Sequence, residues 1–219
     1  MEWRENSGVR WLQAELPGAT AAFPTRSAGS LKEDAVPMAV ALGLAPERIV
    51  SGRQVHGAKL AFRSAATAET PEADGQVMLA AGPVGLVYTA DCLPIALAGP
   101  DGVAMLHCGW RGLAAGIVAR GAESVNATHA AIGPGIGPCC YEVGDEVLSA
   151  FATLGDGIAH GSILDLPEVA RRLLSRAGVE SIESAGLCTR CEQELFFSHR
   201  RDGGPGRQGG LAWIETGGV

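Results

Sequence analysis

The chain has few charged residues and very little lysine. Charged residues make up 19% of its 219 residues, and Lys32 and Lys59 are its two lysines, so arginine supplies nearly all of the positive charge. The net charge is −7. This balance disfavours a nucleic-acid-binding protein, which needs a basic surface. With 47% apolar residues, the low charged fraction also disfavours a disordered chain.

The sequence lacks an uninterrupted apolar run of membrane-spanning length. Its longest apolar stretch, 82–99, contains Asp91 and two prolines, which is typical of a core segment. The opening MEWRENSGVRW has no apolar region of the kind found in signal peptides. Six cysteines without a secretory signal are expected to be thiols or metal ligands in a reducing compartment. We therefore expect a cytoplasmic protein that does not bind membranes.

No internal repeat, low-complexity tract or linker is visible, so we expect residues 1–219 to form one domain. Hydrophobic patterns and turn residues predict strands at 10–15, 19–23, 84–89, 93–98, 103–107, 130–132, 182–186, 195–199 and 211–214, with broken extended structure at 48–62. Helical spacing predicts helices at 33–44, 113–125, 144–154 and 165–177. This mixture favours an α+β fold, a layered α/β/β/α-type sandwich with mixed sheets, over a regular βαβ repeat.

Three residues that can bind a metal or act in catalysis lie at the edges of apolar strands: His56 in QVHG, Cys92 in ADCLP and His107 in LHCGW. The turn at 99–102 predicts a hairpin that places Cys92 and His107 nearly opposite each other. Neighbours across a hairpin have Cβ atoms roughly 5 Å apart. The two residues can therefore share a metal ion or form a Cys–His dyad.

One thiolate and two imidazoles form a suitable zinc ligand set that leaves a fourth position open, as in catalytic zinc sites. A zinc ion lowers the pKa of bound water to roughly 7. The three residues are dispersed in the chain, so their spacing alone is weak evidence for a shared metal. The alternative is that Cys92 is a buried small apolar residue and that both histidines are hydrogen-bonded core residues.

Arg111 lies one residue before Gly112, near which the helix over 113–125 is expected to begin. A helix N-terminus and an adjacent guanidinium together favour a phosphate or carboxylate. The functional interpretation is an oxyanion pocket beside the metal, and the alternative is a surface arginine that caps a neighbouring carbonyl. Trp110 is expected in the core or in the pocket wall.

The remaining cysteines and histidines form no compact ligand motif. Cys139 and Cys140 are adjacent, which disfavours a disulfide between them, and they end a glycine- and proline-rich loop. The CxxC formed by Cys188 and Cys191 is a single pair, so we expect structural thiols there rather than zinc or a redox pair. The arginine-rich segment FFSHRRDGGPGRQGG is either a basic loop at the mouth of the site or a solvated turn.

Several motifs occur in an order that resembles the laccase-domain family, also described as multicopper polyphenol oxidoreductase-like or purine nucleoside phosphorylase-type proteins. They are QVHG at 54–57, TADCLPI at 89–95, H-x-GWRG at 107–112, IGPxIGPCCYEVG at 132–144 and FFSxRRDG at 196–203. The resemblance runs from about Thr25 through the rest of the chain. The combination is specific, although each motif alone would not be.

The resemblance implies a layered single-domain sandwich and a zinc ion held by His56, Cys92 and His107. It implies phosphorolysis of adenosine, inosine and methylthioadenosine, and deamination of adenosine. Some members of this family were first described as laccases, some are linked to peptidoglycan fidelity, and the fold is similar to that of toxins that deamidate glutamine with a Cys–His pair.

This sequence departs from the family pattern at three motifs. Cys108 replaces the usual alanine of HAGWRG, TRSAG at 25–29 replaces TRxGG, and FFSHRR replaces FFSYRR. The first change places a second thiol beside the expected ligand His107, so copper is the alternative to zinc as the cofactor. No departure removes an expected ligand.

These observations lead us to expect a zinc-dependent purine nucleoside enzyme with a purine nucleoside and phosphate as its partners. His56, Cys92 and His107 are the expected catalytic residues and metal ligands, while Arg111, Arg26 and Gln54 are expected to contact substrate or phosphate. Asp91 is a candidate proton shuttle for deamination. The alternatives are a cysteine hydrolase with a Cys92–His107 dyad, a copper-dependent polyphenol oxidase, for which five histidines are too few, and a binding module without turnover.

Overall fold

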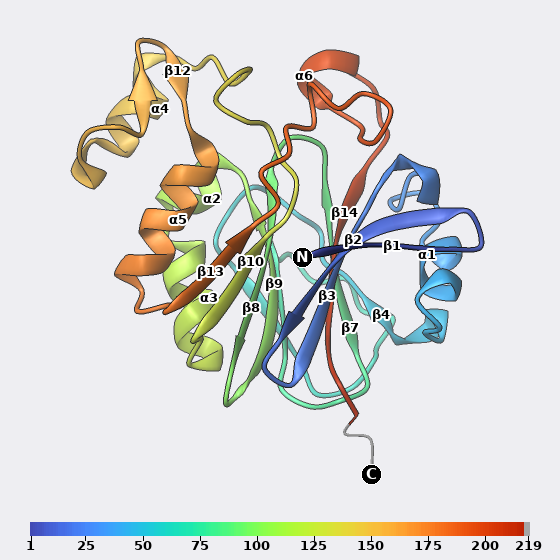
Figure 1. The fold of residues 1–219 in the computed structure, drawn as a ribbon. Coiled ribbons are helices and arrows are strands. Elements are labelled where there is room, and N and C mark those ends of the chain that lie inside the picture. The colour runs from blue at the N-terminus through green and yellow to red at the C-terminus, as the bar shows by residue number, and fades with distance from the viewer. Residues whose placement is uncertain (217–219) are drawn as a thin grey trace.

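The computed structural model describes residues 1–216 and contains two six-stranded sheets packed face to face (Figure 1). The first sheet has the order β1 (Glu2–Asn6), β2 (Val9–Leu16), β3 (Ala19–Pro24), β14 (Gln208–Ile214), β7 (Val84–Thr89) and β4 (Ile49–Val50). The second has the order β13 (Ser181–Ser184), β10 (His129–Ile132), β8 (Leu93–Gly99), β9 (Gly102–Cys108), β6 (Gly75–Met78) and β5 (Leu60–Arg63). Each sheet combines parallel and antiparallel pairs.

Helices cover the outer faces of both sheets (Figure 1). The α-helices are α1 (Val36–Ala41), α2 (Trp110–Ala114), α3 (Ile117–Val125), α4 (Asp145–Ala150), α5 (Leu166–Arg176) and α6 (His199–Asp202). Short 3₁₀ turns η1 (Arg26–Ala28), η2 (Pro46–Arg48) and η3 (Ala152–Leu154) and a two-stranded ribbon of β11 (Ala159–His160) and β12 (Ile163–Leu164) complete the described elements. The predicted α+β sandwich with mixed sheets is confirmed.

The alternation of side chains along the central strands separates the core layers. On β8, Ile95 and Leu97 face the layer beneath α3 and α5, whereas Ala96 and Ala98 face the other sheet. Seven of the thirteen buried residues in the layer between the sheets are alanines, and these small side chains let the two sheets approach closely. The longer aliphatic side chains are buried against the helices instead.

The same alternation separates the two adjacent residues His107 and Cys108 at the end of β9. Cys108 is fully buried in the layer beneath the helices, with Leu106 and Leu113. His107 points from the opposite face of the strand, on the side of Met105. Burial raises the pKa of the Cys108 thiol well above its ordinary value, so this sulfur is a neutral core group.

Three predicted helices differ from the structure. The helix expected at 33–44 is shorter because Gly43, with φ +69°, ends it. The helix expected at 113–125 starts earlier, at Trp110, and is divided into α2 and α3 at Gly116, whose φ is +84°. The segment at 144–154 forms α4 followed by η3. The apolar pattern of this segment does not indicate the break between Ala150 and Ala152.

The strand predicted at 195–199 is wrong. Residues 195–198 form an irregular segment, and His199 begins α6, with the Ser198 side chain accepting a hydrogen bond from the backbone N–H of Arg201. The apolar run LFF suggested a strand, but Phe196 is buried from a loop. Strands β1 and β6 were not predicted, because β1 is polar and exposed and β6, GQVM, has two apolar residues after a glycine and a glutamine.

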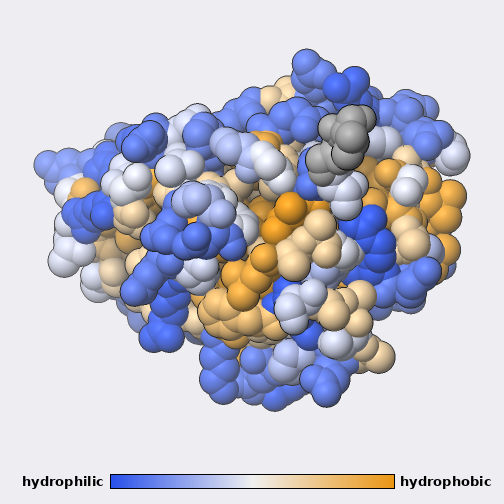
Figure 2. Space-filling model, turned by 90° about the horizontal axis from the view of Figure 1, so that it is seen from below, coloured by the Kyte–Doolittle hydropathy of each residue, from blue (hydrophilic) through white to orange (hydrophobic). Residues whose placement is uncertain are grey.

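No helix within residues 1–216 is both long and apolar enough to cross a membrane. Apolar side chains do gather on the lower face of the molecule, at the end of the sandwich that carries the β8–β9 turn (Figure 2). Leu79 and Ile214 line a shallow depression there. The candidate site lies at the opposite end of these strands.

Candidate metal centre

The structure brings together the three residues that the sequence singled out as metal ligands. His56 lies in the loop between β4 and β5, Cys92 in the bend between β7 and β8, and His107 near the end of β9. One ligand atom from each lies within 4.8 Å of the other two. The two imidazole rings meet edge to face, with centroids 4.8 Å apart. These residues therefore form a group that can hold a metal ion.

A buried carboxylate, Asp74, fixes the geometry of both histidines. Its Oδ1 accepts a hydrogen bond from the His56 backbone N–H and lies 2.8 Å from His107 Nδ1. Its Oδ2 accepts hydrogen bonds from the backbone N–H groups of Val55 and Gly57. Because Nδ1 of His107 is engaged by the carboxylate, Nε2 is the nitrogen left for a metal. Sequence reasoning missed Asp74, which carries no motif signal of its own.

Cys92 and His107 each shift the pKa of the other toward its charged form. Burial raises the pKa of the Cys92 thiol, but the charge of His107 and hydrogen bonds from both histidines outweigh this effect and bring it to about 6. Burial lowers the pKa of His107, but the Cys92 thiolate and Asp74 reverse this effect and raise it to about 9. A binding cation therefore meets a sulfur that loses its proton more readily than an ordinary thiol, and it competes with a proton for the His107 ring.

The two glycines of HCGWRG, Gly109 and Gly112, leave room for the three metal-binding side chains. A Cβ atom at Gly109 would lie 2.9 Å from Cys92 Sγ and 3.3 Å from His56 Cδ2. A Cβ atom at Gly112 would lie 2.9 Å from the carbonyl oxygen of Gly57 in the His56 loop. The start of α2 can therefore pack directly against the ligands only because these positions carry no side chain.

The three residues open into a cavity of about 570 Å³, a size typical of small-molecule sites. The basic residues that line it are Lys32, Arg53, Arg111, Arg200 and Arg207. Asp91 is the acidic residue among the lining, and both of its carboxylate oxygens are engaged, by Thr189 Oγ1 at 2.7 Å and by the backbone N–H of Arg200 at 2.6 Å. An acidic protein thus concentrates positive charge beside the candidate metal centre.

Two of the three expected substrate-contacting residues line the cavity. Arg111 is exposed in α2, stacks on the Trp110 ring at 4.5 Å, and donates no side-chain hydrogen bond to another part of residues 1–216. Gln54 lines the cavity, but its side-chain amide donates to the Tyr88 carbonyl and accepts from the Tyr88 backbone N–H. Arg26 is not among the lining residues, because it stacks on Phe197 and donates to the Gln193 carbonyl.

Two further lining residues, Tyr141 and His199, had no expected role at the site, and a third, Arg200, comes from the arginine-rich segment considered in the sequence. Tyr141 comes from the GPCCYEV loop, and His199 and Arg200 come from α6. Of the two interpretations of the FFSHRRDG segment, the structure supports the basic loop at the mouth of the site. Burial and the nearby Cys92 thiolate raise the pKa of Tyr141 to about 12, so its phenol remains a hydrogen-bond donor at neutral pH.

The donor set fits a divalent metal such as zinc. Two imidazoles and a thiolate are favoured zinc ligands, and Asp74 supplies the outer-shell contact that ligating histidines usually have. Three protein ligands leave one position open, and His56 is exposed toward the cavity. This combination is typical of a catalytic rather than a structural metal site.

The fold and the site define a class of protein: a two-sheet α+β sandwich with a His–Cys–His centre at the base of a basic cavity. The chain belongs to the family described as multi-copper polyphenol oxidoreductase laccase, whose model matches residues 28–215. The resemblance inferred from the motifs is therefore confirmed.

Similar proteins cover most of the chain. It is 37% identical over 187 residues to purine nucleoside phosphorylase YfiH of Escherichia coli (strain K12), covering 80% of this chain and 77% of that protein. It is 34% identical over 232 residues to purine nucleoside phosphorylase SCO2081 of Streptomyces coelicolor, covering 97% and 93%. The crystal structure of YlmD from Geobacillus stearothermophilus matches with a TM-score of 0.80 and 30% identity, covering 98% of this chain and 99% of that one.

Proposed function

We propose that residues 1–219 act as a single-domain, metal-dependent purine nucleoside phosphorylase. The observation that carries this proposal is the concentration of five basic side chains in the cavity beside the His–Cys–His group, in a chain of net charge −7. A phosphate ion and a nucleoside need a cavity of this kind, with cationic groups for the anion and apolar walls for the base. The names of the similar proteins support the same activity.

The reaction replaces the bond between C1′ of ribose and N9 of the purine. A phosphate oxygen forms a bond to C1′, the C1′–N9 electron pair leaves with the base, and the base takes up a proton. The products are the free base and ribose 1-phosphate. Arg111 has a free guanidinium fork for the phosphate, and Arg200 lines the same cavity.

The metal would be held by His56, Cys92 and His107, and zinc is the ion that we propose, with copper as the alternative. When bound, it would supply Lewis-acid polarisation of a substrate atom at its open position. The chain orients that position through Asp74, which fixes His107 and the His56 loop. Trp110, Ile136 and Tyr141 provide flat or apolar cavity walls for the purine ring.

One residue that borders the cavity has an unsatisfied polar atom. Thr89 Oγ1 is the buried side-chain oxygen or nitrogen that lacks a hydrogen-bond partner within the described part of the chain. Thr89 also lines the cavity. Because an unpaired buried hydroxyl is costly, we assign it to an ordered water or to a polar group of the substrate.

We propose adenosine, inosine and methylthioadenosine as substrates, and deamination of adenosine as a second reaction of the same site. Deamination replaces the amino group at C6 of adenine with oxygen from water and releases ammonia. Asp91 does not serve as the proton shuttle in this proposal, since Thr189 and Arg200 occupy its two oxygens.

Incubation of the zinc-loaded protein with adenosine, with and without phosphate, tests the proposal. Phosphorolysis predicts adenine and ribose 1-phosphate in the presence of phosphate only, and deamination predicts inosine in both samples. Chromatography separates these products. If adenosine, inosine and methylthioadenosine all remain intact with zinc and phosphate present, the proposed function is wrong.

A cysteine hydrolase is the second candidate, because Cys92 Sγ and a His107 ring nitrogen lie within 4.8 Å of each other, and their mutual effect lowers the pKa of the thiol and raises that of the imidazole. His56 would then have no essential role, and chelators would leave the activity intact. A multicopper oxidase has less support, because His56, Cys92 and His107 provide one three-ligand group, whereas laccase chemistry needs several copper ions.

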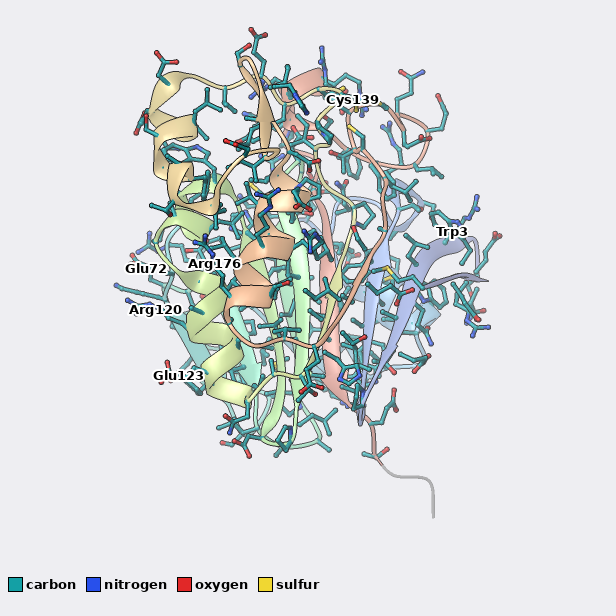
Figure 3. All side chains as sticks on the ribbon, turned by 60° about the vertical axis from the view of Figure 1, so that its left-hand side comes forward. Trp3, Glu72, Arg120, Glu123, Cys139 and Arg176 are labelled. Carbon is teal, nitrogen blue, oxygen red and sulfur yellow. The ribbon has the colours of Figure 1, made fainter. Side chains whose placement is uncertain are left out.

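Substitution of Arg111 tests the anion-binding part of the proposal. Arg111→Gln is expected to raise KM for phosphate about 10- to 100-fold, since a charge-assisted hydrogen bond contributes about 1.5–3 kcal/mol. Arg111→Lys should recover part of this loss, because it keeps the charge but not the fork. Steady-state kinetics with varied phosphate measures both effects. Arg120→Gln, on the exposed surface of α3 (Figure 3), is the matched control and should leave KM unchanged.

A further inference from the structure

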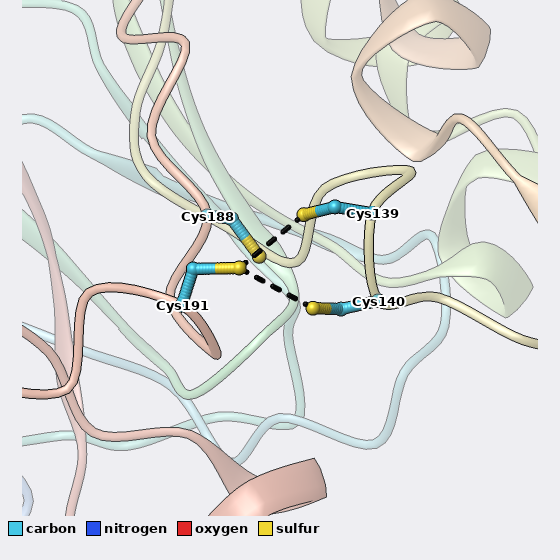
Figure 4. A group of neighbouring side chains, drawn as sticks. All are labelled: Cys139, Cys140, Cys188 and Cys191. Atoms are coloured by element: carbon cyan, nitrogen blue, oxygen red, sulfur yellow. Dashed lines mark hydrogen bonds between the residues drawn. The ribbon is translucent and has the colours of Figure 1, made fainter.

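Four cysteines outside the cavity converge from two loops (Figure 4), at the end of the molecule where Cys139 is labelled in Figure 3. Cys139 and Cys140 belong to the loop after β10, and Cys188 and Cys191 belong to the segment after β13. We propose that these four thiols form a second metal site, a closed tetrathiolate zinc centre that joins the two loops. The cysteine site does not depend on the proposed function, although the zinc count that tests it includes the ion proposed at His56, Cys92 and His107.

The distances between the sulfurs suit a single metal ion. The four Sγ atoms lie within 4.8 Å of one another, and Cys191 Sγ lies 3.4 Å from both Cys139 Sγ and Cys140 Sγ. A tetrahedral zinc ion with Zn–S bonds of about 2.3 Å places its sulfurs about 3.8 Å apart. The observed group is close to this arrangement before any ion is added.

The same distances do not select a disulfide. A disulfide bond is about 2.05 Å long and joins one pair, whereas Cys191 has two sulfur neighbours at equal distance. Cys139 and Cys140 are adjacent in the chain, which disfavours a bridge between them. One ion can satisfy all four thiols at once, and no single pairing can.

The backbone around Cys188 has the form of a metal-binding turn. The N–H groups of Cys191 and Glu192 both donate to the Cys188 carbonyl, which closes the CxxC into a tight turn. The backbone N–H of Gly137 donates to Cys188 Sγ at 3.2 Å. An N–H···S hydrogen bond from the opposite loop stabilises a thiolate at this position.

The ligand set points to zinc and to a structural role. Four soft thiolates in a tetrahedral arrangement select zinc or iron, and a site with four protein ligands has no open position for substrate. Four thiolates around a dication leave a net charge of −2. The Arg201 guanidinium, itself paired with Asp202, holds the CxxC turn by donating to the Thr189 and Arg190 carbonyls.

The proposed ion would brace a wall of the cavity. Between the two loops, Gly135 pairs with Cys188 in an isolated bridge and Thr189 N–H donates to the Gly135 carbonyl. The first loop continues to the cavity residue Tyr141, and the second leads to α6, which carries Arg200. An ion that locks the loops together therefore also fixes the spacing of these side chains.

Metal analysis of the full-length protein tests the proposal. Protein purified without chelator, with zinc supplied during expression, is expected to contain two zinc ions per chain by elemental mass spectrometry. Cys139→Ser combined with Cys191→Ser should lower this value to one, and His56→Asn should also lower it to one. Cys108→Ala removes a buried cysteine outside both groups and should retain two.

Cobalt substitution of the wild-type protein gives a readout that needs no variant. Cobalt bound by four thiolates is expected to show much stronger sulfur-to-metal charge-transfer absorption than the single-thiolate centre of His56, Cys92 and His107. A spectrum of one thiolate only, a zinc content that stays unchanged in the double variant, or a disulfide among these four cysteines in the freshly purified protein would each overturn the proposal. Iron at the same cysteines would overturn the assignment of zinc.

Discussion

His56→Asn is expected to remove the catalytic metal and to lower kcat/KM for phosphorolysis at least about a thousand-fold, which corresponds to about 4 kcal/mol of transition-state stabilisation. Asparagine is the suitable replacement, because His56 has φ +61° and asparagine tolerates this left-handed conformation. His56 is exposed, so the fold should survive the change. Metal content and steady-state kinetics measure the two effects.

The matched control is His160→Asn, an exposed histidine in β11 outside the cavity. It should keep both metal and activity. Full activity in His56→Asn together with complete loss in Cys92→Ala would contradict the metal-dependent mechanism and support the thiol nucleophile. The circular dichroism spectrum of each variant establishes that the fold is retained.

Asp74→Asn is expected to lower the free energy of unfolding of the metal-free protein by about 3–5 kcal/mol, the range for breaking a buried charged network. Each carboxylate oxygen accepts two hydrogen bonds. In one orientation the asparagine NH₂ group faces the N–H groups of Val55 and Gly57, and in the other it faces the His56 N–H and forces the His107 ring to accept through Nδ1, so at least one backbone donor is left unsatisfied. Urea denaturation of the metal-free protein measures this loss. Metal affinity should also fall about 10- to 100-fold, because His107 loses its orienting partner.

Glu72→Gln is the matched control, since Glu72 lies two residues away and pairs with Arg53 and Lys59 at the surface (Figure 3). Exposed pairs of this kind contribute at most about 1 kcal/mol. If Asp74→Asn unfolds at the same urea concentration as Glu72→Gln, the buried carboxylate does not hold the two histidine-bearing segments together.

The fold class could be predicted because the central strands follow strong local rules. The β8–β9 hairpin has a Gly-Pro-Asp-Gly turn between two apolar runs, and the capped helix α5 begins with Asp165, whose side chain accepts from the Glu168 N–H. Elements without such signals were missed or misplaced. The polar edge strand β1 and the buried loop around Phe196 depend on tertiary contacts that no local pattern encodes.

The candidate site could be predicted only where a residue carries its own chemical signal. His56, Cys92 and His107 are scarce residue types at strand edges, and the structure brings them together. Asp74 resembles any other aspartate in sequence, and its importance comes from burial and from four hydrogen bonds. Arg26 was expected to contact phosphate, but its side chain stacks on Phe197. No pattern in the sequence indicates that direction.

The cysteine cluster shows a different limit of sequence reasoning. In the sequence, the CxxC at 188–191 and the adjacent Cys139 and Cys140 are two separate pairs, and neither pair alone predicts a metal site. The pairing of Gly135 with Cys188, about fifty residues apart in the chain, unites them. Ligand spacing of this kind is visible only after the two loops have been placed side by side.

The position of β14 has a consequence for biosynthesis. This strand, at residues 208–214, lies between β3 and β7 and is the link between the N-terminal hairpins and the rest of their sheet. A nascent chain that has not yet exposed residues 208–214 outside the ribosome cannot complete the sheet. We therefore expect β3 to keep an unpaired edge until β14 has been synthesised. During this period chaperones can bind that edge, and stalled synthesis would favour aggregation.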